Sequence, residues 1–339
     1  MTEYFVEITG EIPNLGKIEV RSLINIVDSS AHIEWVNLFG LISSNVRPVE
    51  FLITRSAYVR RAGRILSKAS RNENPLALVD SEVISNSGAF ENFCVRIDSS
   101  SNESIQIRER ITKELGQKIK ELSGARVDLD KPEKLFLVVM TPEEILLCDA
   151  YNSIIRPILR SQKAGKRPFF HPSMMNSFLA RAMCNLAEVM PGDIVLDPFC
   201  GAGGLLCDIA SIGGIPIGID LNWRLLIGAQ MNLEDQKKFE FGLIQGDSFR
   251  IPILKCDRIV TDPPYGRSSS TRGAQARQLV DTLIRQAPIL LKKTGKVCIG
   301  ASAEMNVGGI IEDNGYSIES QIQILVHKGL IREIFVVTI

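Results

Sequence analysis

The chain has 339 residues, of which 45% are hydrophobic and 23% charged, and its 39 basic side chains balance its 39 acidic ones. This composition can fill packed cores and excludes a mainly disordered, collagen-like or low-complexity protein. The length corresponds to two or three domains of about 150 residues each, and the neutral charge means that any signal for nucleic acid must be local.

The first 150 residues carry strand and helix patterns that do not alternate strictly. The clearest helix is predicted over 104–122, because apolar residues recur there at helical spacing from Ile107 to Leu122. Strands are predicted over 4–9, 31–43, 93–97 and 135–141, and helices over 18–27, 51–72 and 104–122. This order favours an α+β lobe.

Two segments concentrate positive charge. Residues 51–72 hold six Lys and Arg side chains, residues 156–167 hold five, and neither segment contains an acid. A solvated helix face with a basic linker explains this charge as well as a phosphate-binding surface does. The second segment also contains Pro157 and Gly165 and precedes a differently patterned half, so it predicts a domain boundary.

The second half of the chain alternates short strands with helices. Strands are predicted over 194–197, 215–220, 242–247, 258–262 and 296–302, with helical patterns between them. The chain ends in two further strand patterns around Lys328 and Gly329, which predict a hairpin. The expected class is α/β: a mostly parallel, doubly wound sheet with an antiparallel C-terminal hairpin, preceded by the α+β lobe.

A glycine-rich turn, IVLDPFCGAGG at 194–204, follows the first of these strands. Gly201 and Gly203 let the backbone approach a ligand, and the next helix offers free N–H groups. Asp220 and Asp247 end the second and third strands, where an acid can accept hydrogen bonds from a ribose. The turn lacks GxGxxG, and Asp197 would repel a diphosphate. S-adenosylmethionine, which carries an ammonium and a sulfonium, suits this site better than a dinucleotide.

The sequence TDPPYG at 261–266 follows the fourth strand. The paired prolines stiffen the turn and remove two donors, which leaves the Asp262 carboxylate, the Pro263 carbonyl and the Tyr265 ring. These groups suit a planar base with an exocyclic amine, whose nitrogen is a poor nucleophile because its lone pair is delocalised. Hydrogen bonds accepted from both N–H groups of this amine would return electron density to the nitrogen and stabilise the positive charge that develops there. A polar turn without chemistry is the alternative, and the position after the fourth strand disfavours it.

In this order, LDPFCGAGG, GIDLN, GDS and DPPYG resemble the Rossmann-like amino-methyltransferases that use S-adenosylmethionine, over about 168–339. Residues 50–147 resemble the THUMP RNA-binding domain more loosely, and 1–50 the ferredoxin-like domain that precedes it. The junction 167–193 is similar to that of the tRNA guanosine-10 N2-methyltransferase family, archaeal type. We therefore expect a ferredoxin-like domain at 1–50, a THUMP domain at 51–150, a basic linker at 151–168 and a methyltransferase domain at 169–339.

This resemblance implies methylation of guanine N2 at position 10 of tRNA, once or twice, with the N-terminal domains on the acceptor stem and the THUMP domain on the 3′ end. It implies that the target guanine is held by Asp262, Pro263, Pro264 and Tyr265. It implies that the cofactor is contacted by Asp197, Phe199, Gly201, Gly203, Asp220, Asp247 and Ser248. The basic residues expected on RNA are Arg55, Arg60, Arg61, Arg64, Lys68, Arg96, Lys166 and Arg167. Ala202 stands where many relatives have threonine, so a small hydroxyl is missing there, which should alter the cofactor contacts without abolishing them.

Other functions stay open at this point, because DPPY occurs in both DNA and RNA amine methylases. The alternatives are N2 methylation at tRNA position 6 or in ribosomal RNA, DNA adenine methylation, and a non-catalytic tRNA-binding protein with a decayed methylase fold. The intact DPPY segment argues against the last of these.

The sequence also predicts a cellular setting. No apolar run approaches the roughly 20 residues of a membrane span, and the N-terminus lacks the features of a signal peptide. The seven cysteines are widely spaced and form no CxxC pair, so we expect neither disulfides nor a zinc site. We expect a cytoplasmic monomer that binds tRNA, with no membrane and no metal. Eukaryotic relatives act with a small activator protein, and the sequence leaves that partner open.

Overall fold

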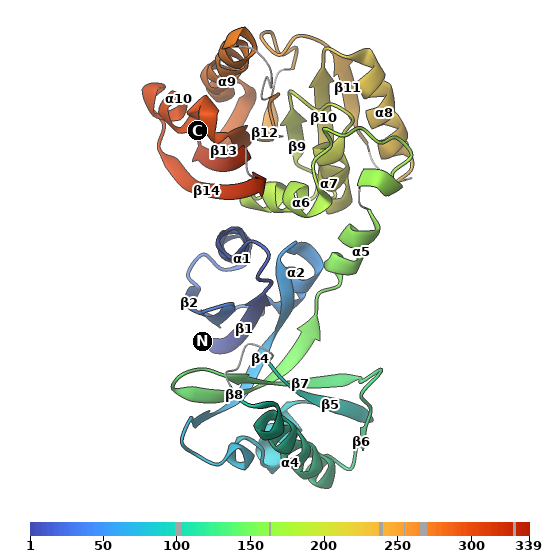
Figure 1. Ribbon diagram of the computed structural model, residues 1–339, viewed down its shortest axis with the longest axis vertical. Coiled ribbons are helices and arrows are strands. Elements are labelled where there is room, and N and C mark those ends of the chain that lie inside the picture. The colour runs from blue at the N-terminus through green and yellow to red at the C-terminus, as the bar shows by residue number, and fades with distance from the viewer. Residues whose placement is uncertain (99–102, 163, 237–239, 254, 265–269, 328–329) are drawn as a thin grey trace. The chain divides into compact units, whose positions relative to one another are not determined.

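The computed structural model describes residues 1–98, 103–162, 164–236, 240–253, 255–264, 270–327 and 330–339 (Figure 1). The chain divides into two compact units. Unit 1 consists of Met1–Gly10, Val27–Thr54 and Val59–Ser153, and unit 2 of Glu11–Ile26, Arg55–Tyr58 and Ile154–Ile339. In the ranges that the structure describes, no helix is both long and apolar enough to cross a membrane.

Unit 1 is built on one mixed sheet with the strand order β2-β3-β1-β4-β8-β7-β5-β6. The strands are β1 (Thr2–Ile8), β2 (His32–Val36), β3 (Phe39–Ser44), β4 (Val59–Ser70), β5 (Asn92–Ile97), β6 (Arg126–Val127), β7 (Lys134–Met140) and β8 (Glu144–Asn152). The helical segments are α2 (Val49–Arg55), η1 (Pro75–Leu78), α3 (Ser81–Asn86) and α4 (Ile105–Ser123). The predicted α+β lobe is confirmed.

The central strands of this sheet bury both of their faces. Alternate residues of a strand point to opposite sides, so Phe93 and Phe136 pack beneath α4 while Cys94 and Leu135 join a second cluster on the other face. Helix α4 begins at the side-chain cap of Ser104 and ends before Gly124, which adopts a left-handed φ of 71°. The helix predicted over 104–122 is thereby confirmed.

The helix predicted over 51–72 is wrong beyond its first turns, because α2 ends at Arg55 and β4 follows. Strand β4 lies between β1 and β8 in the middle of the sheet. Gly63 permits this pairing, since a Cβ atom there would lie 1.9 Å from the Asp149 carbonyl oxygen. Strand β4 is hydrogen-bonded to a neighbouring strand on each side, which satisfies its backbone N–H and C=O groups. A count of charged residues along the sequence cannot detect this pairing.

Unit 2 contains a sheet with the strand order β11-β10-β9-β12-β13-β15-β14 (Figure 1). Its strands are β9 (Ile194–Asp197), β10 (Ile215–Asp220), β11 (Gly242–Gln245), β12 (Cys256–Thr261), β13 (Leu291–Ser302), β14 (Ile318–His327) and β15 (Leu330–Thr338). Strands β9 to β13 are parallel, and β15 pairs antiparallel with both β13 and β14. The predicted parallel sheet with an antiparallel C-terminal addition is confirmed.

Helices cover both faces of this second sheet. The helices of unit 2 are α1 (Pro13–Val27), α5 (Ile155–Ser161), α6 (Ser177–Leu186), α7 (Gly204–Ile212), α8 (Trp223–Glu234), α9 (Ser270–Leu290) and α10 (Val307–Asp313), with short turns η2 (Ala164–Lys166) and η3 (Ala303–Met305). Val195 and Val260 pack with α6 and α7, whereas their neighbours Leu196 and Ile259 pack with α9 and α10. This two-sided burial explains why these strands are continuous apolar runs.

The division expected at residue 50 does not coincide with a break in the fold. Strand β1 pairs with both β3 and β4, so residues on either side of that boundary share one sheet. Most of α1 and the connector Arg55–Tyr58 group with unit 2. The separate ferredoxin-like and THUMP domains therefore stay a prediction.

A buried carboxylate fastens α1 and this connector to α6. Glu19 on α1 accepts hydrogen bonds from the Ser56 hydroxyl (2.6 Å), the Ala57 and Tyr58 amides (2.8 and 3.0 Å) and the Asn185 side-chain amide (2.7 Å). Burial raises the pKa of Glu19, and these donors act in the opposite direction.

Replacing Glu19 by alanine should therefore destabilise unit 2 strongly, because it leaves several buried donors without an acceptor. We expect the free energy of unfolding in denaturant to fall by about 3–5 kcal/mol. Glu234→Ala is the matched control in the same unit, since Glu234 is exposed on α8 and the hydrogen bond that it accepts from Gln230 (2.7 Å) should contribute less than about 1 kcal/mol. Equal losses for the two variants would contradict this account.

Candidate active site

The acidic residues predicted from the sequence meet at one edge of the unit 2 sheet. Asp197 ends β9, Asp220 ends β10 and Asp262 directly follows β12, and these three strands run parallel. The strand order reverses direction between β9 and β12 (Figure 1). Ligands of doubly wound sheets bind at this kind of switch point, beyond the carboxyl ends of the strands.

The glycine turn after β9 leaves space for a ligand. Gly201 has a left-handed φ of 51°, and a Cβ atom built there would meet nothing within 4 Å. Gly203 has φ 79°, and its Cβ would lie 3.0 Å from the Cβ of Ala229 on α8. The first glycine thus forms an open cradle, and the second is required both by its backbone conformation and by the close approach of α8.

Asp197 lies beneath this turn and is only 1% exposed. Its Oδ1 accepts hydrogen bonds from the Thr261 hydroxyl (2.7 Å) and the Phe199 amide (3.1 Å). Burial raises the pKa of Asp197 to about 7; these hydrogen bonds oppose the rise, and the negative charges of Asp262 and Asp220 add to it. A positively charged ligand group would restore the ionised form.

Asp220 is tied to the same turn. Its Oδ2 accepts from the Gly201 amide (2.9 Å) and its Oδ1 from the Asn222 amide (2.8 Å), which fixes the carboxylate at the end of β10. Leu221, the next residue, is 68% exposed. The sequence reasoning missed this apolar side chain, although its place directly after the acid could have indicated it.

The loop after β11 is anchored to the glycine turn. The buried Ser248 hydroxyl donates to the Pro198 carbonyl. Asp247 is exposed, and its Oδ1 accepts from the Phe249 amide (3.0 Å). Ser248 therefore holds the loop in place while Asp247 lies at the surface.

Asp262 forms an ion pair with Arg332 of β15, with 3.2 Å between Oδ2 and Nη2. Pro263 is buried and Pro264 exposed, and the predicted stacking residue Tyr265 lies outside the described residues. Sequence reasoning missed Arg332, which lies 70 residues further along the chain. The antiparallel register that pairs Arg332 with Ser302 carries it to this edge of the sheet.

Two of the basic residues predicted to bind RNA face the protein interior. Arg55 is 6% exposed and donates to Asn185 Oδ1 (2.7 Å) and to the Val189 carbonyl. The Arg167 side chain is buried beside Asp208, 3.5 Å away. Neither guanidinium reaches the surface, so we remove both from the predicted RNA contacts.

The basic residues of β4 have acidic or carbonyl partners within unit 1. Arg60 and Arg61 pair with the buried carboxylate of Glu7 at 3.0 and 3.2 Å. Lys68 pairs with Glu3 at 2.6 Å, and Arg64 donates to the Asn86 carbonyl. These contacts stabilise the sheet. Lys166, in η2, is exposed.

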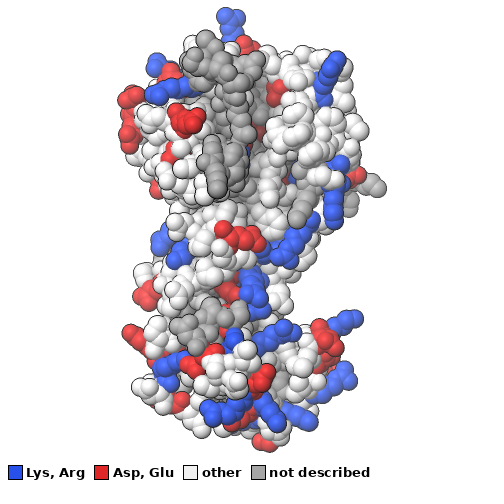
Figure 2. Space-filling model, viewed as in Figure 1, with Lys and Arg blue, Asp and Glu red and all other residues white. Residues whose placement is uncertain are grey.

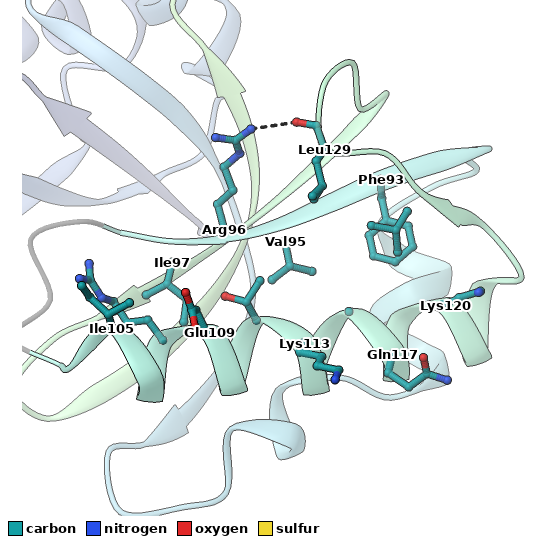
Figure 3. Close-up of a pocket in the computed structure, with 14 residues that line it drawn as sticks. Phe93, Val95, Arg96, Ile97, Ile105, Glu109, Lys113, Gln117, Lys120 and Leu129 are labelled. Carbon is teal, nitrogen blue, oxygen red and sulfur yellow. Dashed lines mark hydrogen bonds between the residues drawn. The ribbon is translucent and has the colours of Figure 1, made fainter.

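A cavity of about 670 Å³ lies between β5 and α4 in unit 1 (Figure 3). Its apolar lining includes Phe93, Val95 and Leu129, and Arg96 extends from β5 to the Leu129 carbonyl at 3.0 Å. Basic residues of α4 also line it, namely Arg108, Lys113 and Lys120. On the face shown in Figure 2, Lys and Arg gather around α4, with acidic side chains between them.

Comparison with known proteins shows which family this chain resembles. Residues 164–334 match the UPF0020 family, described as RMKL-like, methyltransferase domain. The tRNA (guanine(10)-N2)-dimethyltransferase of Methanothermobacter thermautotrophicus is 31% identical over 338 residues, covering 99% of each chain. The enzyme of that name from Methanocaldococcus jannaschii is 29% identical over 356 residues, covering 97% of each.

The chain belongs to the tRNA (guanine(10)-N2)-dimethyltransferase family. It is a methyltransferase, and its cofactor is S-adenosylmethionine. The cradle at Gly201 and the buried acid Asp197 fit a ligand that carries an ammonium group. The crystal structure of TrmN from Thermus thermophilus shares the fold, with a TM-score of 0.55 at 18% identity over 99% of each chain.

The raised pKa of Asp197 predicts a pH-dependent stability. A folded-state pKa of about 7 lies above the ordinary value of 3.8, so the cofactor-free protein should lose stability as the pH rises between these values. The loss should be on the order of 4 kcal/mol at pH 8. Asp197→Asn should remove this dependence, because the amide oxygen still accepts from Thr261 and Phe199.

Denaturant unfolding of both proteins from about pH 5 to pH 8 measures this difference. Asp247→Asn serves as the control, since Asp247 is exposed and should leave the profile unchanged. A wild-type profile that matched the profile of Asp197→Asn would contradict the raised pKa.

Proposed function

We propose that this chain transfers a methyl group from S-adenosylmethionine to the exocyclic N2 of guanosine 10 in tRNA, once or twice. The observation that carries the proposal is the position of Asp262, on a rigid proline turn beside the open glycine cradle. The archaeal relatives whose names give this substrate align with nearly the whole chain. A paired guanine hides its N2 against cytosine, so the target base must leave the helix.

The chemistry assigned to the chain is activation of a weak nucleophile. The Asp262 carboxylate and the Pro263 carbonyl accept one hydrogen bond each from the two N–H groups of guanine N2. These bonds localise the nitrogen lone pair and stabilise the positive charge that develops on the nitrogen. The bound cofactor supplies an electrophilic methyl group on its sulfonium. A strong base is unnecessary, because the amine loses its proton after the transfer. Tyr265 would stack on the base.

The cofactor is assigned to the cradle. Asp197 and the turn through Phe199, Gly201 and Gly203 would hold its methionine end, and Asp220 its ribose. Asp247 would meet the adenine edge, with Ser248 holding that loop in place. Leu221 joins this set as an exposed apolar side chain that can cover one face of the adenine.

We propose that helix α4, rather than β4, is the main RNA-binding element of unit 1. A cavity with an apolar floor and a basic rim suits unstacked bases and their phosphates, which supports contact with the single-stranded 3′ end of tRNA. Arg96, which the sequence predicts to bind RNA, lies in this lining, and we add Lys113 and Lys120 to the proposed contacts. Lys166 stays in the proposal as an exposed cation, and the half-exposed Arg60, Arg64 and Lys68 have secondary roles beside their protein partners.

We infer that the chain acts on tRNA as a cytoplasmic monomer. A small activator protein, like the one used by eukaryotic relatives, would find an exposed apolar row on α8 formed by Trp223, Ile227 and Met231. Light scattering of the purified chain, alone and with tRNA, tests the monomer.

The decisive experiment is nucleoside mass spectrometry of an unmodified tRNA transcript after incubation with enzyme and cofactor. The proposal expects N2-methylguanosine or N2,N2-dimethylguanosine that maps to position 10. Product at position 6, in ribosomal RNA or on DNA adenine would select one of the alternative enzymes. Bound tRNA without any product would select the non-catalytic alternative.

Asp262→Ala should lower the methylation rate on the order of 100-fold or more, because the acceptor of the N2 hydrogen bond is lost. The affinity for tRNA should be unchanged, since phosphates supply most of the binding energy. Single-turnover rates and filter binding separate the two effects. Asp257→Ala, at the other end of β12, is the matched control and should keep the wild-type rate. Rate and affinity falling together would contradict the assigned role.

We expect tRNA binding to be weakened by each of the variants Lys113→Glu and Lys120→Glu. The slope of log affinity against log salt concentration should also become shallower, by about one for each phosphate that the variant no longer neutralises. Arg110→Glu makes the same charge change on the same helix, outside the cavity lining, and is the control. If Arg110→Glu weakens binding as much as the other two, the cavity is not the RNA site.

A further inference from the structure

The ion pair between Asp262 and Arg332 connects the catalytic turn to the antiparallel end of the sheet. The two side chains are 15% and 16% exposed, so the pair is largely removed from water. A charged hydrogen bond in such surroundings is stronger and more directional than one at the surface. Arg332 extends from β15 across β13 to reach Asp262, which follows β12.

The other oxygen of the same carboxylate lies against a glycine. A Cβ atom added at Gly300 of β13 would lie 2.7 Å from Asp262 Oδ1 and 3.4 Å from Met183 Cε. Any larger residue at this position would push the carboxylate out of place. Gly300 and Arg332 therefore define where the carboxylate of Asp262 lies, one by leaving room and the other by attraction.

The charged groups around Asp262 also influence whether its carboxyl group is ionised. The titratable groups that interact with Asp262 include Asp197 on β9, Arg332 on β15 and the buried Cys298 thiol on β13. Glu333, the neighbour of Arg332, instead accepts from Gln321 and Gln323. The negative charge of Asp197 favours protonation of Asp262, and a protonated carboxyl accepts the hydrogen bond of the amine more weakly and carries no charge to stabilise the cation that develops. Arg332 opposes this protonation.

We propose that Arg332 is a positioning residue for methyl transfer, which keeps the Asp262 carboxylate ionised and aimed at the amine of the target guanine. This inference rests on the proposed function of Asp262. Arg332 does not touch the reacting atoms; it acts through the carboxylate. Each carboxylate oxygen has lone pairs for more than one donor, so Asp262 can keep Arg332 while it accepts from guanine.

The test compares Arg332→Met, Arg332→Lys and wild type in single-turnover methylation over a range of pH. Arg332→Met should lower the rate near pH 7 by at least about tenfold, with unchanged affinity for tRNA. Its loss should be larger at low pH and smaller at high pH, because the pKa of Asp262 rises when the guanidinium is removed. Arg332→Lys should restore part of the rate and move the pH profile back. Lys292→Met is the matched control, because it removes the cation paired with Asp257 (2.8 Å) at the other end of β12.

Three outcomes would overturn the proposal. A uniform loss at every pH without rescue by lysine would give Arg332 a structural role only. A faster Arg332→Met enzyme would mean that Arg332 competes with the base for the carboxylate. A wild-type rate and pH profile in Arg332→Met would show that the pair has no role in the reaction.

A second measurement separates this inference from the proposed function. In protein labelled with ¹³C-aspartate, Asp262→Asn assigns the Asp262 carboxyl signal, and its titration is followed in wild type and in Arg332→Met. The proposal expects a higher apparent pKa in the variant, and an unchanged pKa would overturn it. This readout needs no tRNA, whereas a wild-type enzyme that made no methylguanosine would overturn the proposed function itself.

Discussion

The site depends on holding several carboxylates close together at one edge of a parallel sheet. Parallel strands end at the same edge, so β9, β10 and β12 bring Asp197, Asp220 and Asp262 there together. Burial raises the pKa of Asp197, and the negative charges of Asp262 and Asp220 add to the rise. Donors offset the repulsion between these carboxylates locally: the Thr261 hydroxyl on Asp197, the Gly201 amide on Asp220 and the Arg332 guanidinium on Asp262. The result is a negatively charged edge suited to a cationic methyl donor.

Small residues make the space that this edge requires. Gly203 allows α8 to approach the turn, Gly300 leaves room for Asp262, and Gly218 on β10 accepts the side chains of Leu206 and Cys200, which lie 2.6 and 2.8 Å from where its Cβ would be. Gly201 differs from these three, because the space beside it stays open. The shape of this edge is thus set by the positions that lack a side chain as much as by those that have one.

Much of the active site could be predicted because its residues follow strands whose apolar patterns are clear. Asp197, Asp220 and Asp262 each stand at the end of such a strand, and parallel pairing then brings them together. Arg332 could not be found in this way, since its position depends on the register between β13 and β15. The basic segment at 51–72 has the charge of a solvated helix, but pairing on both sides and the missing side chain of Gly63 make most of it a central strand. Arg55 and Arg167 carry charge in the sequence, but their partners Asn185 and Asp208 lie far along the chain and hold them inside.

The central claim is that the exocyclic amine of the target guanine is the group that Asp262 recognises and activates. A tRNA transcript with inosine in place of guanosine 10 tests it most directly, because inosine lacks only that amine. Transfer of labelled methyl groups from the cofactor is measured for both transcripts, together with their binding. The account predicts equal binding and methyl incorporation into the guanosine transcript alone. Methyl incorporation into the inosine transcript at the same rate would contradict it.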